Sequence, residues 1–213
     1  MKITYFIDYN CPYSYIGLQR IRKACESLDL DAEWEMRPFE IEPQAGKRTT
    51  VSITERYAEK YDLSAEDASD KIKEIEEIAH EDGLEMNLKD ITLTSSKDAL
   101  RFSKFVQNNH PELTLSLVDE IFKANMVDNI NLTNLDILAD IAVSCGIEES
   151  EARKILENNY FNIDVFRDME NATSSGITST PCFILEEDGS KSIIPEILSI
   201  KEFANAIADL IGK

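Results

Sequence analysis

FIDYNCPYSYIG, at residues 6–17, joins a short apolar segment to one with helical periodicity. Residues 2–8 are rich in Ile, Tyr and Phe, as buried strands are. Pro12 favours the first position of a helix, and apolar residues then recur at helical spacing as far as Leu28. Cys11 therefore stands between a predicted strand and a predicted helix.

The two ends of the chain have strand patterns, whereas the middle does not. Residues 31–41 alternate apolar and polar side chains, which predicts a strand with Pro38 at its edge or end. The intervening helix fits a crossover, so the two strands should be parallel. Near the other end, Asp188-Gly189 predicts a hairpin turn between short strands, and a helix follows at 200–211. The block between them is predicted to be helical, at residues 52–62, 64–82, 97–108, 112–126, 133–144, 148–159 and 161–174.

The composition excludes several classes of function. The 213 residues hold 22 basic and 41 acidic side chains, a formal net charge of −19. So acidic a surface repels nucleic acid and anionic membranes. Asp8 interrupts the first apolar segment, which argues against a signal peptide, and no apolar run approaches the ~20 residues of a membrane span. We therefore expect a cytoplasmic protein.

The cysteine and histidine pattern gives no support to a metal site. The four cysteines are widely spaced, no CxxC pair occurs, and His80 and His110 are the only histidines. Zinc sites usually need closely spaced Cys or His ligands. We expect no metal and no tightly bound cofactor.

Three motifs resemble a known family. FIDYNCPYSYIG resembles the active-site segment of the DsbA-like thioredoxin superfamily, and is closest to its FrnE-like branch of dithiol–disulfide isomerases, which reads CPWCYIG. RPFEIEP, at 37–43, resembles that branch's second strand, and ITSTPCF, at 177–183, resembles the loop whose cis-proline faces the catalytic cysteine.

The resemblance implies an α/β, thioredoxin-like fold with a large all-α insertion. Residues 1–50 and 166–213 would form the thioredoxin-like domain, and residues 51–165 the inserted helical domain.

Ser14 departs from this pattern, because it stands where the family has a second, resolving cysteine. The resulting CxxS site also resembles the SPYS segment of kappa-class glutathione transferases and chromene-carboxylate isomerases. The resemblance implies that Cys11 is the nucleophile, with Ser14 donating a hydrogen bond to its sulfur.

Cys11 has a physical reason to be reactive. A helix that begins at Pro12 makes Cys11 its N-cap, where unpaired N–H groups and the helix dipole favour a thiolate and lower the thiol pKa. The alternative is a buried, inert cysteine. By resemblance, Pro12 and Tyr13 contact the substrate, while backbone groups at Thr180 and Pro181 pair with an extended peptide or with glutathione.

Cys182 leaves two interpretations open: it faces Cys11 and resolves mixed disulfides, or it faces the core. Cys25 lies about 21 Å from Cys11 along the same predicted helix, too far for a disulfide.

The leading hypothesis is therefore a DsbA-like thiol–disulfide oxidoreductase or isomerase that acts through one cysteine and mixed disulfides. Its partners would be thiol or disulfide substrates, with glutathione as one candidate co-substrate. The alternatives are a glutathione-dependent transferase or cis–trans isomerase, and an adaptor that has lost turnover. Both a monomer and a homodimer remain open.

Overall fold

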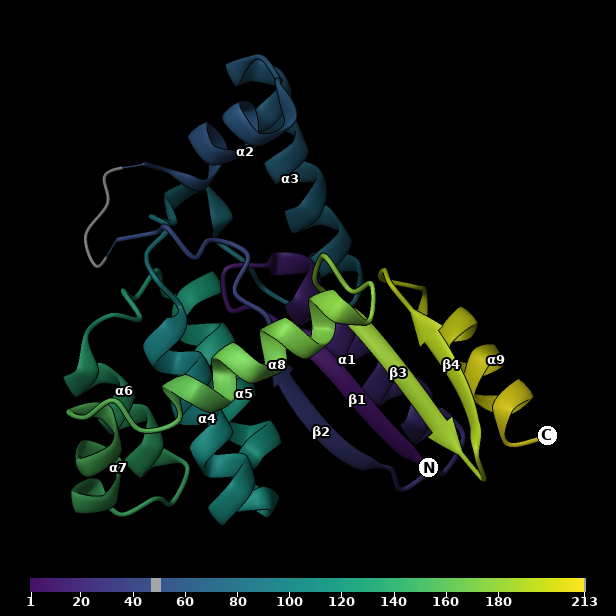
Figure 1. Ribbon diagram of the computed structural model, residues 1–213. Helices are drawn as coiled ribbons and strands as arrows, with labels where there is room; N and C mark the ends of the chain where they lie inside the picture. The colour runs from purple at the N-terminus through teal and green to yellow at the C-terminus, as the bar shows by residue number, and fades with distance from the viewer. Residues whose placement is uncertain (47–50, 213) are drawn as a thin grey trace. The chain divides into compact units, whose positions relative to one another are not determined.

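The computed structural model describes residues 1–46 and 51–212 (Figure 1). The chain folds into two compact units, Met1–Ile41 with Phe161–Lys213, and Glu42–Tyr160. Residue 50, where the first segment of the thioredoxin-like domain was predicted to end, lies outside the described residues. None of the helices in the described part combines the length and apolar character needed to span a membrane.

The first unit contains a four-stranded sheet in the order β2-β1-β3-β4. Strand β1 is parallel to β2 and antiparallel to β3, and β3 is antiparallel to β4. The predicted parallel pair and the predicted hairpin at Asp188-Gly189 are thus confirmed. Strand β2 lies at an edge of the sheet and ends at Pro38. Proline has no N–H to donate, and at this position no hydrogen bond of the sheet is lost because of it. The strands are β1 (Lys2–Ile7), β2 (Glu33–Pro38), β3 (Cys182–Glu187) and β4 (Ser190–Ile194).

Three helices cover the two faces of this sheet: α1 (Pro12–Ser27), α8 (Asn162–Ser174) and α9 (Ile200–Leu210). Helices α1 and α9 pack together on one face, and α8 crosses the other (Figure 1). Alternation along β3 sends Phe183 toward α9, where its ring meets Phe203 edge to face at 5.2 Å between centroids. Its neighbours Cys182 and Ile184 point to the opposite face, into a cluster with Ala172 of α8.

An ion pair also joins helix α8 to strand β2. Arg37 pairs with Asp168, which is buried, and with Glu35 on the same strand. A buried carboxylate needs such a partner, because losing water without one is costly.

The second unit is helical, as the periodicity predicted. Side chains bond to main-chain groups at two of its helix ends. Ser52 and Glu55 form a capping box at the start of one helix. The buried Arg101 donates to the carbonyls of Ile155 and Leu156, at the end of another, at 2.7 and 2.6 Å. These bonds satisfy carbonyl groups that a helix end leaves unpaired. The helices are α2 (Ile53–Tyr61), α3 (Ala65–Glu81), η1 (Leu88–Asp90), α4 (Lys97–Asn109), η2 (Pro111–Leu113), α5 (Thr114–Met126), α6 (Leu135–Ser144) and α7 (Glu149–Leu156).

Gly17 lets helix α1 approach the sheet closely. A Cβ added there would lie 3.0 Å from the Phe183 ring and 3.1 Å from Ile197 Cγ2. The Phe183 ring is fully buried, so it has little room to move. We predict that Gly17→Val lowers the free energy of unfolding by about 2 kcal/mol through overpacking. Urea unfolding followed by the fluorescence of Trp34, the single tryptophan, reports on this unit.

Glu26→Ala on the exposed side of α1 is the matched control, and should change stability by less than about 0.5 kcal/mol. A Gly17→Val protein as stable as the wild type would mean that the helix and sheet are not in close contact.

Candidate active site

Cys11 is the N-cap of helix α1, as predicted, and Pro12 is the first helical residue. Its backbone is extended (φ −104°, ψ 105°), which suits an N-cap. Its N–H donates to the Asp8 carbonyl at 3.0 Å, and its carbonyl accepts from the Ser14 N–H at 2.9 Å. Both main-chain groups of Cys11 are therefore fixed, so the strand-to-helix turn sets the direction of its side chain.

The sulfur of Cys11 meets the loop that precedes strand β3. Its S–H donates to the Thr180 carbonyl at 3.3 Å. The antiparallel pairing of β1 with β3, which places Phe6 opposite Cys182, brings these residues together from distant parts of the sequence. The Thr180–Pro181 peptide bond is cis, as the resemblance implied. The structure thus brings together three of the residues expected at the site, Cys11, Thr180 and Pro181.

Burial changes the acid–base expectation for Cys11. The side chain is 5% exposed, and loss of water raises the pKa of its thiol above the ordinary value. The hydrogen bonds that Ser14 and Thr180 can donate to a thiolate at Cys11 lower its pKa, whereas the Asp8 carboxylate raises it further. This direction is opposite to the lowered pKa that the sequence predicted. A helix N-terminus favours the thiolate, but the loss of water around the buried sulfur disfavours it more strongly. The 3.3 Å separation between the sulfur and the Thr180 carbonyl suits a protonated thiol, because a thiolate cannot donate to a carbonyl.

Two hydroxyl groups beside the sulfur lack partners in the resting site. Ser14 is fully buried, and neither its Oγ nor the Thr180 Oγ1 has a hydrogen-bond partner among the described residues. Both side chains act to lower the Cys11 pKa, as donors to a thiolate do. Unpaired buried hydroxyls are costly, and both of these lie where they could donate to a negatively charged Cys11 sulfur.

Asp8 is a site residue that sequence reasoning missed. Its side chain is fully buried; one carboxylate oxygen accepts from the Asn10 N–H at 3.0 Å and the other from the Ile41 N–H at 2.6 Å. The available signal was an acidic residue at the end of an apolar strand, three positions before Cys11.

The comparisons with known proteins agree with this geometry. A family model for the DSBA-like thioredoxin domain matches residues 2–208. The chain belongs to the DsbA-like thioredoxin family.

The uncharacterized protein YwbO of Bacillus subtilis is 23% identical over 98% of this chain and 96% of that protein. A probable DsbA oxidoreductase from Streptomyces coelicolor shares the fold, with a TM-score of 0.89, 23% identity and coverage of 100% of this chain and 91% of that one. The cytosolic disulfide reductase DsbM from Pseudomonas aeruginosa, solved with GSH, has a TM-score of 0.68 at 11% identity, covering 100% of each chain.

Within this DsbA-like site, the structure favours the core interpretation of Cys182. That side chain is 1% exposed and packs with Phe6, Ala172 and Ile184, on the face of the sheet opposite to helix α1. Burial raises the pKa of its thiol to about 11. The thiol pKa of Cys25, in the body of helix α1, is also raised to about 11 by burial. Neither sulfur is in a disulfide.

Pro12 and Tyr13, expected to contact substrate, occupy the first two positions of helix α1. Pro12 is buried, whereas Tyr13 is half-buried, so Tyr13 offers the accessible surface of the pair.

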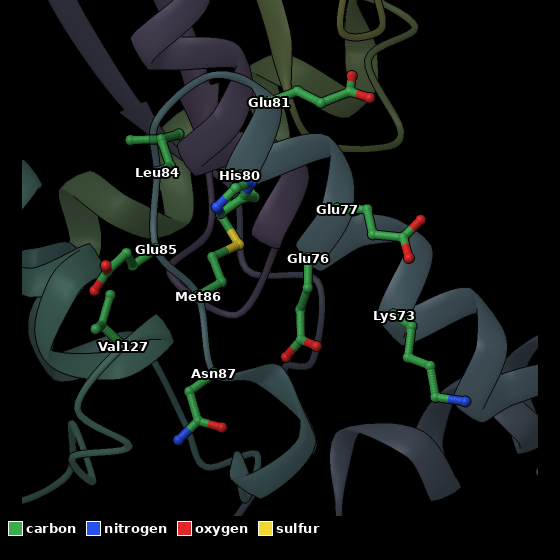
Figure 2. Close-up of a pocket in the computed structure, with 10 residues that line it drawn as sticks. All are labelled: Lys73, Glu76, Glu77, His80, Glu81, Leu84, Glu85, Met86, Asn87 and Val127. Atoms are coloured by element: carbon green, nitrogen blue, oxygen red, sulfur yellow. The ribbon is translucent and has the colours of Figure 1, made fainter.

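A separate hollow of about 690 Å³ lies in the helical unit (Figure 2). Figure 2 shows Glu77 and Glu81 projecting from helix α3 away from the segment that carries Met86 and Asn87. The lining includes four glutamates and His80. Among the described residues, however, no group of three or more His, Cys, Asp or Glu side chains is arranged to hold a metal ion.

Alkylation kinetics should report the raised pKa of Cys11. Because the thiolate is the nucleophile, the iodoacetamide rate should rise with pH, with a midpoint above that of an ordinary thiol. Ser14→Ala removes a hydrogen bond to the thiolate, so it should raise this midpoint and slow alkylation at pH 7.5 by about three- to tenfold. Peptide mass spectrometry after reaction at pH 6–10 would measure both effects.

Ser27→Ala, on the same helix with its hydroxyl bonded to the Ala24 carbonyl, is the matched control and should leave the Cys11 profile unchanged. A midpoint well below that of a free thiol would contradict the assignment.

Proposed function

We propose that the protein is a DsbA-like thiol–disulfide oxidoreductase that works through Cys11 alone, by way of mixed disulfides. The observation that carries the proposal is the contact of the Cys11 sulfur with the Thr180 carbonyl, beside a serine in the resolving position. Cys182, on the other face of the sheet, offers no second thiol at this site.

The reaction needs a thiol from outside the chain. The Cys11 thiolate attacks one sulfur of a substrate disulfide, which forms a mixed disulfide and expels the other sulfur as a thiolate that takes up a proton. A small thiol such as glutathione then attacks the substrate sulfur of the mixed disulfide. Cys11 leaves as a thiolate, and the substrate carries the new disulfide. Electrons balance without another oxidant, and a reducing compartment such as the cytoplasm supplies the thiol.

Thr180 links substrate binding to activation in this scheme. In the substrate-free protein its carbonyl accepts from the Cys11 S–H. An extended peptide pairing with the same loop would offer a backbone N–H to this carbonyl, as in β-augmentation. The sulfur would then lose its acceptor and turn to the Ser14 and Thr180 hydroxyls, which stabilise the thiolate. Tyr13, at the exposed edge of the site, would contact the same peptide.

Oxidised glutathione tests the single-cysteine mechanism. We predict that the wild-type protein gains the mass of one glutathione at Cys11 and retains it, because Ser14 cannot expel it. Ser14→Cys should instead release glutathione and form an internal disulfide. Intact-protein and peptide mass spectrometry distinguish the two products.

Cys182→Ser is the matched control, and should form the same adduct with the same stability. If the wild-type protein instead lost its glutathione and formed an internal disulfide, and if Cys182→Ser prevented this, Cys182 would be the resolving thiol. That result would refute the single-cysteine mechanism.

A glutathione-dependent transferase or isomerase is the second candidate. The buried Ser14 hydroxyl favours it, because a hydroxyl beside a sulfur would also activate a bound glutathione thiol. The solved DsbM structure that contains GSH adds to this case. The Cys11→Ala variant distinguishes the two hypotheses. Calorimetry of this variant with S-methylglutathione should show saturable binding if the protein is a transferase. It should show no binding if the protein holds glutathione only as a mixed disulfide.

A further inference from the structure

The main-chain turn that carries Cys11 is organised by a single buried carboxylate. Asp8 accepts from the Asn10 N–H through one oxygen and from the Ile41 N–H through the other, while its carbonyl accepts from the Cys11 N–H. These three bonds use both oxygens of the carboxylate and the main chain of the same residue. The Asn10 and Ile41 groups that meet the carboxylate are both N–H donors, which suits an ionised carboxylate because it only accepts.

The carboxylate extends the β1–β2 ladder beyond the end of the strands. The last backbone bond of this edge runs from the Phe39 N–H to the Ile7 carbonyl at 2.9 Å. One step further, the Asp8 side chain replaces a backbone acceptor and takes the Ile41 N–H at 2.6 Å. Strand β1 can therefore turn away toward helix α1 while the segment after β2 stays bonded to it.

We propose that Asp8 is a positioning residue for Cys11, whose carboxylate fixes the turn that aims the thiol at Thr180 and places a negative charge behind the sulfur. The inference rests on the proposed function, because it matters for catalysis only if Cys11 is the nucleophile. Asp8 acts through Cys11 and takes no part in bond making or breaking.

The charge has a chemical consequence for disulfide exchange. The groups that act on Cys11 are the Ser14 hydroxyl and N–H on α1, Thr180 before β3, and Asp8 at the end of β1; Asp8 alone is charged, and it raises the thiol pKa. A thiol of higher pKa is a poorer leaving group. Asp8 therefore slows the step in which an incoming thiol displaces Cys11, so the mixed disulfide persists for longer.

Two carboxylate-to-amide variants test this role. Asp8→Asn keeps the shape and one acceptor oxygen but removes the charge. Asp168→Asn removes a buried carboxylate from the same unit, where it pairs with Arg37 between helix α8 and strand β2. We expect Asp8→Asn to lower the midpoint of Cys11 alkylation and to speed the reaction at pH 7.5 by about three- to tenfold. Asp168→Asn should leave the profile unchanged.

The rate at high pH separates charge from a loosened site. When all of Cys11 is thiolate, the less basic sulfur of Asp8→Asn should react somewhat more slowly than the wild-type sulfur, whereas greater exposure would raise the plateau rate. An unchanged midpoint in folded Asp8→Asn, or an equal shift in Asp168→Asn, would overturn the inference. A lowered midpoint with a raised plateau would support the part of the inference in which the carboxylate holds the turn. If Asp8→Asn does not fold, Asp8→Ser, which retains an oxygen for the Asn10 N–H, undergoes the same test.

The proposed function can fail independently of this inference. Alkylation needs no disulfide substrate, so a shifted midpoint with no glutathione adduct would uphold the role of Asp8 and refute the exchange mechanism. A glutathione adduct at Cys11 together with an unchanged alkylation midpoint in Asp8→Asn would support the exchange mechanism and refute the role of Asp8.

Discussion

Removal of water from the Cys11 sulfur governs the rest of the site. The thiol lies under the loop before strand β3, and its S–H bonds to the Thr180 carbonyl. Burial favours the neutral thiol, whereas the serine and threonine hydroxyls beside it act in the opposite direction and favour the thiolate. The site therefore separates two requirements that usually compete, protection of a thiol from solvent and stabilisation of its thiolate.

Much of the fold follows from local patterns. The strand before Cys11, the helix that begins at Pro12 and the turn at Asp188-Gly189 depend on residues close in sequence, so periodicity and turn chemistry predict them. The same holds for the helices of the second unit, whose apolar faces recur at regular spacing. The role of Gly17 does not follow from such patterns, because the contact that it permits, with Phe183, involves a strand from the far end of the sequence.

The acid–base state of the site could not be predicted in this way. The helix N-terminus at Cys11 is a local feature, and it correctly indicated groups that stabilise a thiolate. The desolvation of the Cys11 sulfur depends on atoms from several distant segments, including the loop at Thr180. A local sequence motif therefore cannot predict it. Asp8 was missed for a related reason: its role depends on the Ile41 N–H, and this partner is set by the tertiary pairing of β1 with β2.

The sheet joins β1 directly to β3, and 169 residues separate Cys11 from its acceptor at Thr180. A ribosome therefore completes the whole helical unit before it makes the residues that bury Cys11. Until then, the Thr180 carbonyl and the other atoms of that loop are missing, so a partly made chain lacks some of the burial that raises the Cys11 pKa.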